Sequence, residues 1–501
     1  METVDHYIDG KITKFTNKYF DHCNPATGEV CSKVAIGDEE VVNSAVASSL
    51  KAFETWSRTA PIKRARILFK FTELLNQNIN KLAEIITLEH GKTLADAKGS
   101  VGRGIEVVEH CCGITNLLQG KLSNNVSTDI DVYTIRKPLG VCAGIGPFNF
   151  PIMVPVWLAL PAIACGNTFI IKPSEKVPKT VMFLAELLTA AGLPNGVLNV
   201  VNGQKTVVDG LLNHPDVQAV SAVGSTPVVE YIYKTAINNN KRSQTFGGAK
   251  NHCIIMPDAD LANASEQVSG AAFGAAGERC MALSVAIVVG DKQRHDAIVN
   301  KIKSHAQTIK VGNGLDSKTD MGPLITREHL NKILGYIEEG VQSGANLLLD
   351  GRNVEISDPK SKNGFYLAPS IFTDVKTDMS IYRDEIFGPV LVVLHVKDYQ
   401  SALEIINNNM YGNGSSIFTN DLNISRNFAN EVTTGMVGIN IPIPVPFVTH
   451  SFGGWKSSAF GDLAMHSAES IQFYTKAKSV TIGLAKVDKA ASQSSLTMPT
   501  H

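Results

Sequence analysis

Short β-rich runs alternate with helical runs from Pro138 onward, and this alternation restricts the possible folds more than any other feature of the sequence. The runs "GVCAGIG", "NTFIIKP", "VLNVVNG" and "VQAVSAVGS" are each followed by a segment with helical character. Strands separated by apolar helices form a parallel sheet that is covered on both faces through right-handed crossovers. The sequence therefore predicts an α/β domain with a doubly wound parallel sheet, an architecture that binds nucleotides.

A second alternation of the same kind predicts a second α/β unit. It runs from "NHCIIMPD" through "SVAIVVG" and "PSIFTDV" to "GMVGIN", and we place the boundary between the units near Gly247 and Gly248. A length of 501 residues also requires two or three units, because a single hydrophobic core rarely grows so large. Residues 38–118 have apolar side chains three and four positions apart and are predicted to be helical.

The stretch Leu139–Ile171 contains 33 residues without a charge, which is longer than a membrane span needs. Four prolines, at positions 147, 151, 155 and 161, would interrupt a spanning helix repeatedly. A strand, a loop, a buried helix and a second strand account for the same residues. We therefore expect no membrane span.

Composition and charge indicate a small-molecule partner and a cytoplasmic location. The formal net charge is -1 and the basic residues are scattered, so the chain lacks the positive field that attracts nucleic acid or an anionic membrane. The N-terminal "METVDHYIDGKITKF" resembles neither a secretory signal nor a transit peptide. The eight cysteines have no spacing suited to zinc, and we expect neither a bound metal nor a structural disulfide.

Cys280, in the small and apolar stretch "FGAAGERCMAL", is the candidate nucleophile. A free thiol with a pKa of about 8.5 is mostly protonated at neutral pH, so a reactive cysteine needs positive charge or oriented dipoles nearby. Arg279 could supply that charge and Glu278 would oppose it, and the order of residues does not decide which of them prevails.

Two strand ends offer groups for a nucleotide, although the G-x-G-x-x-G fingerprint is absent. In "SAVGSTP", Gly224 and Ser225 open a helix whose free N–H groups could hold a pyrophosphate, or could simply form its cap. In "IIKPSEK", Lys172, Glu175 and Lys176 end a buried strand. A carboxylate there can accept both hydroxyls of a ribose, but ordinary polar loop residues would show the same pattern.

Taken together, these segments resemble the aldehyde dehydrogenase superfamily over nearly the whole chain. The motifs that carry the resemblance are, in order, "GPFNFP", "IKPSE", "VGSTP", "GGAKN", "GERC", "EIFGPV" and "YGNGSSIFT". Finer features such as "GRGIEVVEH" and "INIPIPVP" are similar to one branch, the CoA-acylating methylmalonate-semialdehyde dehydrogenases. The resemblance implies an NAD-binding domain at 1–118 and 140–247, a catalytic domain at 248–450, an oligomerisation ribbon at 119–139 and 466–485, and a tail at 486–501.

The resemblance places the family's nucleophile on Cys280 and its oxyanion-binding amide on Asn149, in "PFNFP". The thiolate would attack the aldehyde carbonyl, while the Asn149 amide and the Cys280 N–H stabilise the oxyanion. Without its companion motifs, Asn149 would be interpreted as a turn residue between two aromatic side chains.

The family's contacts to the cofactor fall on residues in four short stretches of this sequence. They are Gly146, Phe148, Lys172, Glu175, Lys176, Gly224, Ser225, Glu385 and Phe387. In this assignment Glu385 holds the nicotinamide ribose and Phe387 packs nearby. The Glu175 carboxylate favours a free 2'-hydroxyl over a 2'-phosphate, so NAD is expected rather than NADP, although two neighbouring lysines weaken that inference.

One position departs from the hydrolytic members of the superfamily. Those enzymes carry a glutamate in "ELGGK" that activates water, whereas Phe246 occupies that position here, in "TFGGAKN". Without this base, a thioester on Cys280 would wait for a thiol. The resemblance therefore implies that CoA accepts the acyl group.

Two arginines imply that the substrate carries a carboxylate. The branch binds that group through residues that match Arg103, in "VGRGIE", and Arg279. Two guanidinium groups can grip and orient a carboxylate. Once the aldehyde has become a thioester, the carboxylate can leave as CO2, giving propionyl-CoA from methylmalonate semialdehyde or acetyl-CoA from malonate semialdehyde. Alternatively, Arg103 is a solvated helix residue and Arg279 a structural ion-pair partner.

Three further points follow from the resemblance. The branch usually has Gln where this chain has Glu278, and a negative charge there could raise the pKa of the thiol. A hydrolytic dehydrogenase that draws its base from Glu385, and an inactive scaffold or binding protein, are the alternative functions. A β-ribbon that pairs "DIDVYTIRK" with "IQFYTKAKSVTI" implies a homodimer or homotetramer.

Overall fold

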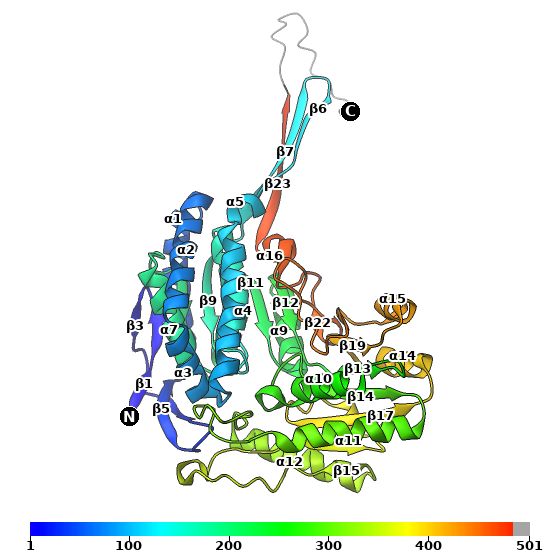
Figure 1. Ribbon diagram of the computed structural model, residues 1–501. Coiled ribbons are helices and arrows are strands. Elements are labelled where there is room, and N and C mark those ends of the chain that lie inside the picture. The colour runs from blue at the N-terminus through cyan, green and yellow to red at the C-terminus, as the bar shows by residue number, and fades with distance from the viewer. Residues whose placement is uncertain (484–501) are drawn as a thin grey trace, which may run out of the picture.

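Two largely parallel sheets, one protruding ribbon and two small sheets form the part of the chain that the computed structural model describes, residues 1–483 (Figure 1). The small sheets are β1-β5-β4, with β1 (Glu2–Val4), β5 (Val30–Ala35) and β4 (Tyr19–Cys23), and β18-β21, with β18 (Tyr411–Gly412) and β21 (Trp455–Lys456). Each of the two largely parallel sheets has its own hydrophobic core, and the strand–helix alternation of the sequence is present in both. The α/β fold class predicted from the sequence is confirmed. The tail predicted at 486–501 lies outside the described residues.

The first sheet contains eight strands in the order β22-β12-β11-β8-β9-β10-β2-β3. Its outer strands are β22 (Ala459–Phe460), β2 (His6–Ile8) and β3 (Lys11–Thr13). Its five central strands run parallel, with β9 and β10 on one side of β8 and β11 and β12 on the other. This order reverses the direction of chain progress between β8 and β11, where ligands bind in folds of this type. The central strands are β8 (Val141–Ile145), β9 (Thr168–Lys172), β10 (Leu198–Val200), β11 (Val217–Val223) and β12 (Arg242–Phe246).

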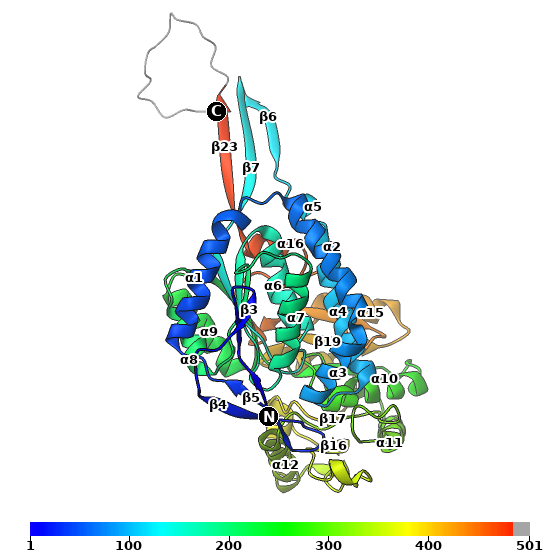
Figure 2. The ribbon, with the colours of Figure 1, turned by 90° about the vertical axis from the view of Figure 1, so that its left-hand side faces the viewer.

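Helices cover both faces of this sheet (Figures 1 and 2). One face carries α6 and α7, with α2, α3 and α4 packed outside them, and the other carries α1, α8 and α9. The helices predicted over residues 38–118 from the apolar spacing are present in the structure. These helices are α1 (Glu39–Trp56), α2 (Pro61–Gln77), α3 (Ile79–His90), α4 (Leu94–Cys112), α6 (Met153–Cys165), α7 (Pro178–Ala190), α8 (Lys205–Asn213) and α9 (Thr226–Asn238).

The second sheet contains seven strands in the order β15-β16-β17-β14-β13-β19-β20, and all its pairs are parallel except the one at the β15 edge. Helices α10 (Leu261–Phe273) and α11 (Lys292–Thr308) pack against its centre. The strands are β13 (Asn251–Ile255), β14 (Leu283–Val289), β15 (Asn346–Leu349), β16 (Ser370–Thr373), β17 (Val390–Val396), β19 (Gly414–Phe418) and β20 (Met436–Ile439).

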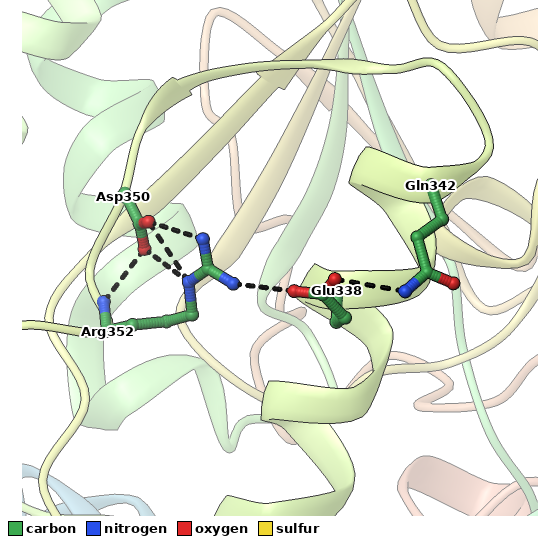
Figure 3. Close-up of polar contacts among 4 residues, drawn as sticks. All are labelled: Glu338, Gln342, Asp350 and Arg352. Carbon is green, nitrogen blue, oxygen red and sulfur yellow. Dashed lines mark hydrogen bonds and ion pairs between the residues drawn. The ribbon is translucent and has the colours of Figure 1, made fainter.

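The β15 edge is joined to α12 (Arg327–Gln342) by a small surface network (Figure 3). The Arg352 guanidinium donates to both Asp350 oxygens and to Glu338 Oε2, at 2.7–3.0 Å. These groups are partly exposed, and ion pairs of this kind add little to stability because water screens them.

The ribbon stands away from both sheets in two perpendicular views (Figures 1 and 2). Its strands are β6 (Leu122–Ser127), β7 (Ile130–Pro138) and β23 (Thr475–Gly483), and Thr475 pairs with Pro138 at one end and Gly483 with Ile130 at the other. The pairing implied by the resemblance is thus present. It begins later than 466, because residues 467–473 form α16 (Ser467–Phe473).

The uncharged stretch Leu139–Ile171 forms β8, α6 and β9, and most of it is buried. Pro161 lies within α6, a helix of 13 residues. Within residues 1–483, the structure contains no helix that is both long and apolar enough to span a membrane.

Asn167 connects the first sheet to the start of the ribbon. Its side chain is fully buried, and its Oδ1 accepts hydrogen bonds from the N–H groups of Leu139 and Gly140, at 2.6 and 3.1 Å. Its Nδ2 donates to the carbonyls of Ala162 and Tyr474, at 3.1 and 2.9 Å. One amide therefore ties together the entry of β8, the end of α6 and the segment that leads into β23.

Replacing Asn167 with Ala should lower the free energy of unfolding by about 3 kcal/mol, because each buried group left without a partner costs about 1–3 kcal/mol. Urea unfolding followed by circular dichroism measures the effect. Asn76→Ala, at an exposed position of α2, is the control and should change the midpoint little. Equal urea midpoints for the two variants would show that the hydrogen bonds of Asn167 do not contribute to stability.

Candidate active site

The predicted cofactor residues lie at one edge of the first sheet. Gly146 and Phe148 follow β8, Lys172 ends β9, and Gly224 follows β11. These three strands are neighbours and run parallel, so their carboxyl ends meet at the same edge. Gly146 N–H donates to the Lys172 carbonyl at 3.0 Å, which brings the first two loops into direct contact. A side-chain methyl at Gly146 would have no neighbour closer than 3.6 Å, so the loop leaves free space here.

Glu175 is held as a carboxylate beside this edge. Lys172 is buried, and its Nζ donates to Glu175 Oε2 at 2.9 Å. Burial acts to raise the pKa of Glu175, but the Lys172 ammonium outweighs it and leaves that pKa below its ordinary value. Glu175 therefore presents a negative charge at the carboxyl end of β9.

The start of α9 completes the edge. Ser225 is exposed at the N-cap, and its side chain makes no capping hydrogen bond, so the helix does not use its hydroxyl. Thr226 Oγ1 accepts the Gly248 N–H at 2.9 Å, and a methyl added at Gly248 would lie 2.6 Å from Glu385 Oε2. The helix start is therefore close to Glu385, which comes from the second lobe. We call the part of the molecule built on the first sheet the first lobe and the part built on the second sheet the second lobe.

Aromatic side chains from both lobes are in contact beside this edge. The Phe148 ring lies 5.7 Å from the Phe387 ring and 5.9 Å from the His90 ring, centroid to centroid, and Lys176 Nζ lies 5.0 Å from its centroid. His329 Nε2 donates to the Phe387 carbonyl at 2.8 Å. Phe148 and Phe387, distant in sequence, are thus neighbours, as a shared cofactor contact requires.

Cys280 lies at the junction of the two lobes, between a short 3-10 turn (Gly274–Gly277) and β14. Its carbonyl accepts hydrogen bonds from the side-chain amides of Asn251 and Asn413, both at 2.9 Å. These two amides fix the backbone on which the thiol is carried.

The turn before Cys280 has an unusual backbone. Ala275 and Ala276 have φ angles of 51° and 53°, and Gly277 has a φ of 70°, in the left-handed region that disfavours side chains. At Gly277 a methyl would lie 2.1 Å from the Gly388 carbonyl oxygen. Only glycine allows this close backbone contact, which joins the Cys280 segment to the loop of Phe387.

Cys280 lines two different hollows. A narrow crevice is lined by Cys280 together with Glu385, Phe387 and the strand ends around Asn251. A larger cavity of about 400 Å³ is lined by Cys280, both predicted substrate arginines and a mostly apolar wall. Its lining includes Arg103, Arg279, Phe150, Met153, Trp157, Met281, Ile443, Val445 and Phe452. Cys280 is partly buried and borders two chemically distinct spaces.

Both arginines of the larger cavity already have acidic neighbours. Arg279 Nη2 donates to Asp96 Oδ1 at 2.6 Å, and Arg103 Nη1 donates to Glu106 Oε2 at 2.6 Å. Arg103 Nη2 also donates to the Pro446 carbonyl. Because a guanidinium has five N–H donors, each arginine keeps donors for a bound anion.

Asn149 is buried next to this cavity, and the following residue, Phe150, forms part of its wall. Its carbonyl accepts a hydrogen bond from Lys92 Nζ at 2.7 Å. Within residues 1–483 the side-chain amide of Asn149 has no hydrogen-bond partner of its own, so it is available to an oxyanion.

The pKa values of Cys280 and Glu278 are both raised, chiefly because the two groups are buried. Burial, and then the Glu385 charge, raise the pKa of Cys280 to about 11, while Lys92 acts in the opposite direction. Burial likewise raises the pKa of Glu278 to about 8, so this carboxyl is mostly protonated at neutral pH. Arg279 is paired with Asp96, so neither sequence neighbour dominates the thiol.

Glu278 is fully buried among groups of both lobes. Its Oε1 accepts the Ile325 N–H at 3.1 Å and lies 3.6 Å from His329 Nε2, and its Oε2 lies 3.8 Å from His90 Nε2. Both imidazoles have pKa values lowered by burial and are neutral at physiological pH.

Phe246 stands at the carboxyl end of β12, where its side chain is buried in the first core. No carboxylate occupies this strand position. Among residues 1–483, no three His, Cys, Asp or Glu side chains are grouped so that they could hold a metal ion.

Sequence reasoning missed several residues of the site. They are Lys92, Asp96, Asn251, His329 and Asn413. Asn251 and Asn413 lie within the motifs "GGAKN" and "YGNGSSIFT", which carried the family resemblance without giving these two residues a role, and the other three lie in no quoted motif. Their contacts all join segments that are far apart in the chain.

Comparisons with known proteins agree over nearly the full length. Residues 12–480 match the profile of the Aldehyde dehydrogenase family. Malonate-semialdehyde dehydrogenase from Pseudomonas aeruginosa is 48% identical over 481 residues, which cover 96% of each chain. The human mitochondrial protein named methylmalonate-semialdehyde/malonate-semialdehyde dehydrogenase [acylating] is 43% identical and covers 100% of this chain and 93% of its own.

Solved structures show the same relationship. A Sinorhizobium meliloti protein, provisionally named methylmalonate-semialdehyde dehydrogenase and complexed with NAD, superposes with a TM-score of 0.96 at 48% identity, covering 98% of this chain and 99% of its own. Methylmalonate-semialdehyde dehydrogenase from Oceanimonas doudoroffii superposes with a TM-score of 0.95 at 48% identity, covering 97% and 99%.

Glu278→Gln should remove a pH-dependent loss of stability. The folded-state pKa of about 8 lies above the ordinary value of 4.5, so the folded chain holds more protons than the unfolded chain between these values. The free energy of unfolding therefore falls by about 1.4 kcal/mol per pH unit as the pH rises through this window. The variant should gain stability relative to the original protein from pH 5 to pH 8.

Urea unfolding of both proteins at several pH values measures this difference. Glu266→Gln, at an exposed position of α10, is the matched control and should follow the original protein at every pH. Parallel curves for Glu278→Gln and the original protein would contradict a raised pKa at this group.

Proposed function

Because the chain belongs to the aldehyde dehydrogenase family, we propose that it is an NAD-dependent, CoA-acylating semialdehyde dehydrogenase. Its substrates are methylmalonate semialdehyde and malonate semialdehyde, and its products are propionyl-CoA and acetyl-CoA with loss of CO2. The observation that carries this proposal is the cavity that Cys280 shares with Arg103 and Arg279. Relatives at 43–48% identity carry the corresponding names.

Arg103 and Arg279 bind the substrate carboxylate through the N–H donors that Glu106 and Asp96 leave free. The apolar wall of Phe150, Trp157 and their neighbours surrounds the carbon chain and excludes water. A carboxylate fixed on the arginines directs the aldehyde carbon of a three-carbon substrate toward Cys280, which lines the same cavity.

The Cys280 thiolate attacks the aldehyde carbonyl and forms a thiohemiacetal. The Asn149 amide, which has no other partner within the described chain, and the Cys280 N–H donate to the developing oxyanion. As the oxyanion collapses, it leaves an acyl group on Cys280 as a thioester.

The residues at the sheet edge fit NAD. Glu175 is a carboxylate suited to ribose hydroxyls, and Lys172, Lys176, Gly224 and Ser225 surround the place for its phosphates. Glu385 and Phe387, in the crevice beside Cys280, hold the nicotinamide end, with Gly146 and Phe148 opposite. When bound, NAD accepts the hydride that the substrate carbon loses.

The acyl-enzyme then has no general base to deliver water, because Phe246 fills the position at the end of β12. The carboxylate β to the thioester carbonyl leaves as CO2, and the electrons of the broken C–C bond form an enolate that takes up a proton. The CoA thiol attacks the thioester and releases the Cys280 thiolate, so one thioester replaces another.

The test is an assay with malonate semialdehyde and NAD, with and without CoA. With CoA we expect continuous NADH formation and acetyl-CoA in equal amount. Without CoA we expect a burst of one NADH per active site and an acylated Cys280, detected by intact-protein and peptide mass spectrometry.

Two results would favour the alternatives. Continuous NADH formation and free acid at an undiminished rate without CoA would indicate a hydrolytic enzyme, with Glu385 as the nearest candidate base. Failure of Cys280 to react with iodoacetamide, together with failure to bind NAD, would indicate an inactive scaffold.

Arg103→Leu and Arg279→Leu should each lower kcat/KM for malonate semialdehyde by about 10- to 100-fold, because each removes charge-assisted hydrogen bonds worth about 1.5–3 kcal/mol. Oxidation of propanal, which lacks the carboxylate, should change little. Arg66→Leu, on the exposed side of α2, is the control. Equal losses with both aldehydes would assign the arginines a structural role instead.

We further propose that the chain acts as a homodimer or homotetramer. The ribbon projects from the body and carries the exposed apolar side chains Leu122, Val126 and Ile482, which a second copy could cover (Figure 2). A cytoplasmic location stays a prediction.

A further inference from the structure

Lys92 is a buried cation beside the proposed oxyanion group. It lies between α3 and α4, and its side chain is fully enclosed. Its Nζ donates to the Asn149 carbonyl at 2.7 Å and lies 4.3 Å from the centroid of the Phe150 ring. A buried ammonium is costly unless it is compensated, and here a carbonyl dipole and an aromatic face compensate it. Both compensating groups belong to the loop that carries the proposed oxyanion donor.

Asp96 connects the same cation to the substrate cavity. Its Oδ2 lies 3.9 Å from Lys92 Nζ, while its Oδ1 accepts from Arg279. Asp96 thus has one cation on each carboxylate oxygen. Because Asp96 lies 2.6 Å from Arg279 and 3.9 Å from Lys92, its carboxylate compensates the Lys92 charge less closely than the Arg279 charge.

The segment that carries Lys92 is held by the second lobe. Leu94 N–H donates to the Gly314 carbonyl at 3.1 Å. A methyl at Gly314 would lie 2.4 Å from the Lys92 carbonyl oxygen, and one at Gly322 would lie 1.9 Å from the Gly91 carbonyl oxygen. The backbone of Lys92 is therefore packed against the lobe that provides Cys280, while its side chain reaches the Asn149 loop of the first lobe.

The surroundings of the ammonium are rich in ionisable groups. They are His90, Asp96, Glu278, Arg279 and Cys280. Burial lowers the pKa of Lys92 to about 8, so the group is still mainly charged at neutral pH. Burial and the Glu385 charge disfavour the thiolate form of Cys280, and the Lys92 charge opposes that effect.

We infer that Lys92 is a positioning residue for the acylation of Cys280. Its ammonium holds the Asn149 loop in place through the Asn149 carbonyl, and its charge favours the Cys280 thiolate at the same time. The inference rests on the proposed function, since it takes Cys280 as the nucleophile and Asn149 as the oxyanion donor.

The first experiment compares Lys92→Met with Lys241→Met. Lys241 is a matched control, because it is also buried and donates to two carbonyls, those of His214 and Val217, but it precedes β12 at the amino end of the sheet. Lys92→Met should lower kcat about tenfold or more and leave the KM for NAD unchanged. It should also slow the alkylation of Cys280 by iodoacetamide at neutral pH, because the Lys92 charge opposes the raised pKa of the thiol, and each unit by which that pKa rises further corresponds to about a tenfold slower reaction.

The second experiment separates charge from position. Lys92→Arg keeps the cation but not its fit to the Asn149 carbonyl, so alkylation should stay within about twofold of the original rate while kcat falls about tenfold. In a double-mutant cycle with Asn149→Ala, the loss in kcat for the pair should be smaller than the product of the single losses, because Lys92 acts through Asn149.

The results distinguish this inference from the proposed function. If Lys92→Met alkylates and turns over as fast as Lys241→Met, the inference is wrong while the function stands. Additive losses in the double-mutant cycle would overturn the positioning role. If Lys92→Met does not fold, Lys92→Arg carries the test, and equal losses of alkylation and kcat in that variant would overturn the inference. A Cys280 that is inert in the original protein would refute the function itself.

Discussion

The burial of one thiol between two lobes is the constraint around which the rest of the site is built. In the proposed reaction Cys280 must be enclosed so that its acyl ester escapes water, yet enclosure raises the pKa of the thiol and disfavours the reactive thiolate. The structure meets these opposed demands with fixed groups. Asn251 and Asn413 hold the backbone of Cys280, and the close contact of Gly277 with Gly388 seals the turn against the Phe387 loop.

The two hollows beside Cys280 divide the proposed reaction between the lobes. The crevice is lined by Glu385 and Phe387, two of the proposed cofactor residues, and the larger cavity holds both arginines within a mostly apolar wall. Phe246 provides no carboxylate at the end of β12, so the same enclosure that protects the thioester leaves a thiol as its acceptor. Specificity for CoA therefore depends as much on a missing base as on any group that is present.

Residues that follow strands were predictable from the sequence, because the carboxyl ends of parallel strands meet at one edge. This is why Gly146, Lys172 and Gly224 come together as expected. The charge balance at Cys280 was not predictable. Arg279 is adjacent in sequence but pairs with Asp96, and Glu278 is mostly protonated because it is buried, whereas Lys92, nearly 190 positions away, opposes the pKa shift of the thiol.

The amino-acid sequence by itself determined the α/β class and the alternation that builds two sheets, and it led to the proposal of Cys280 as the nucleophile, because periodicity and short motifs are local properties of the chain. Only the tertiary structure decided which groups surround Cys280, since Lys92, Asn149, Asp96 and Asn413 come from separate segments that packing alone brings together. The tertiary structure also decided the pKa of each ionisable group, because desolvation depends on what covers a group and not on its neighbours in the sequence.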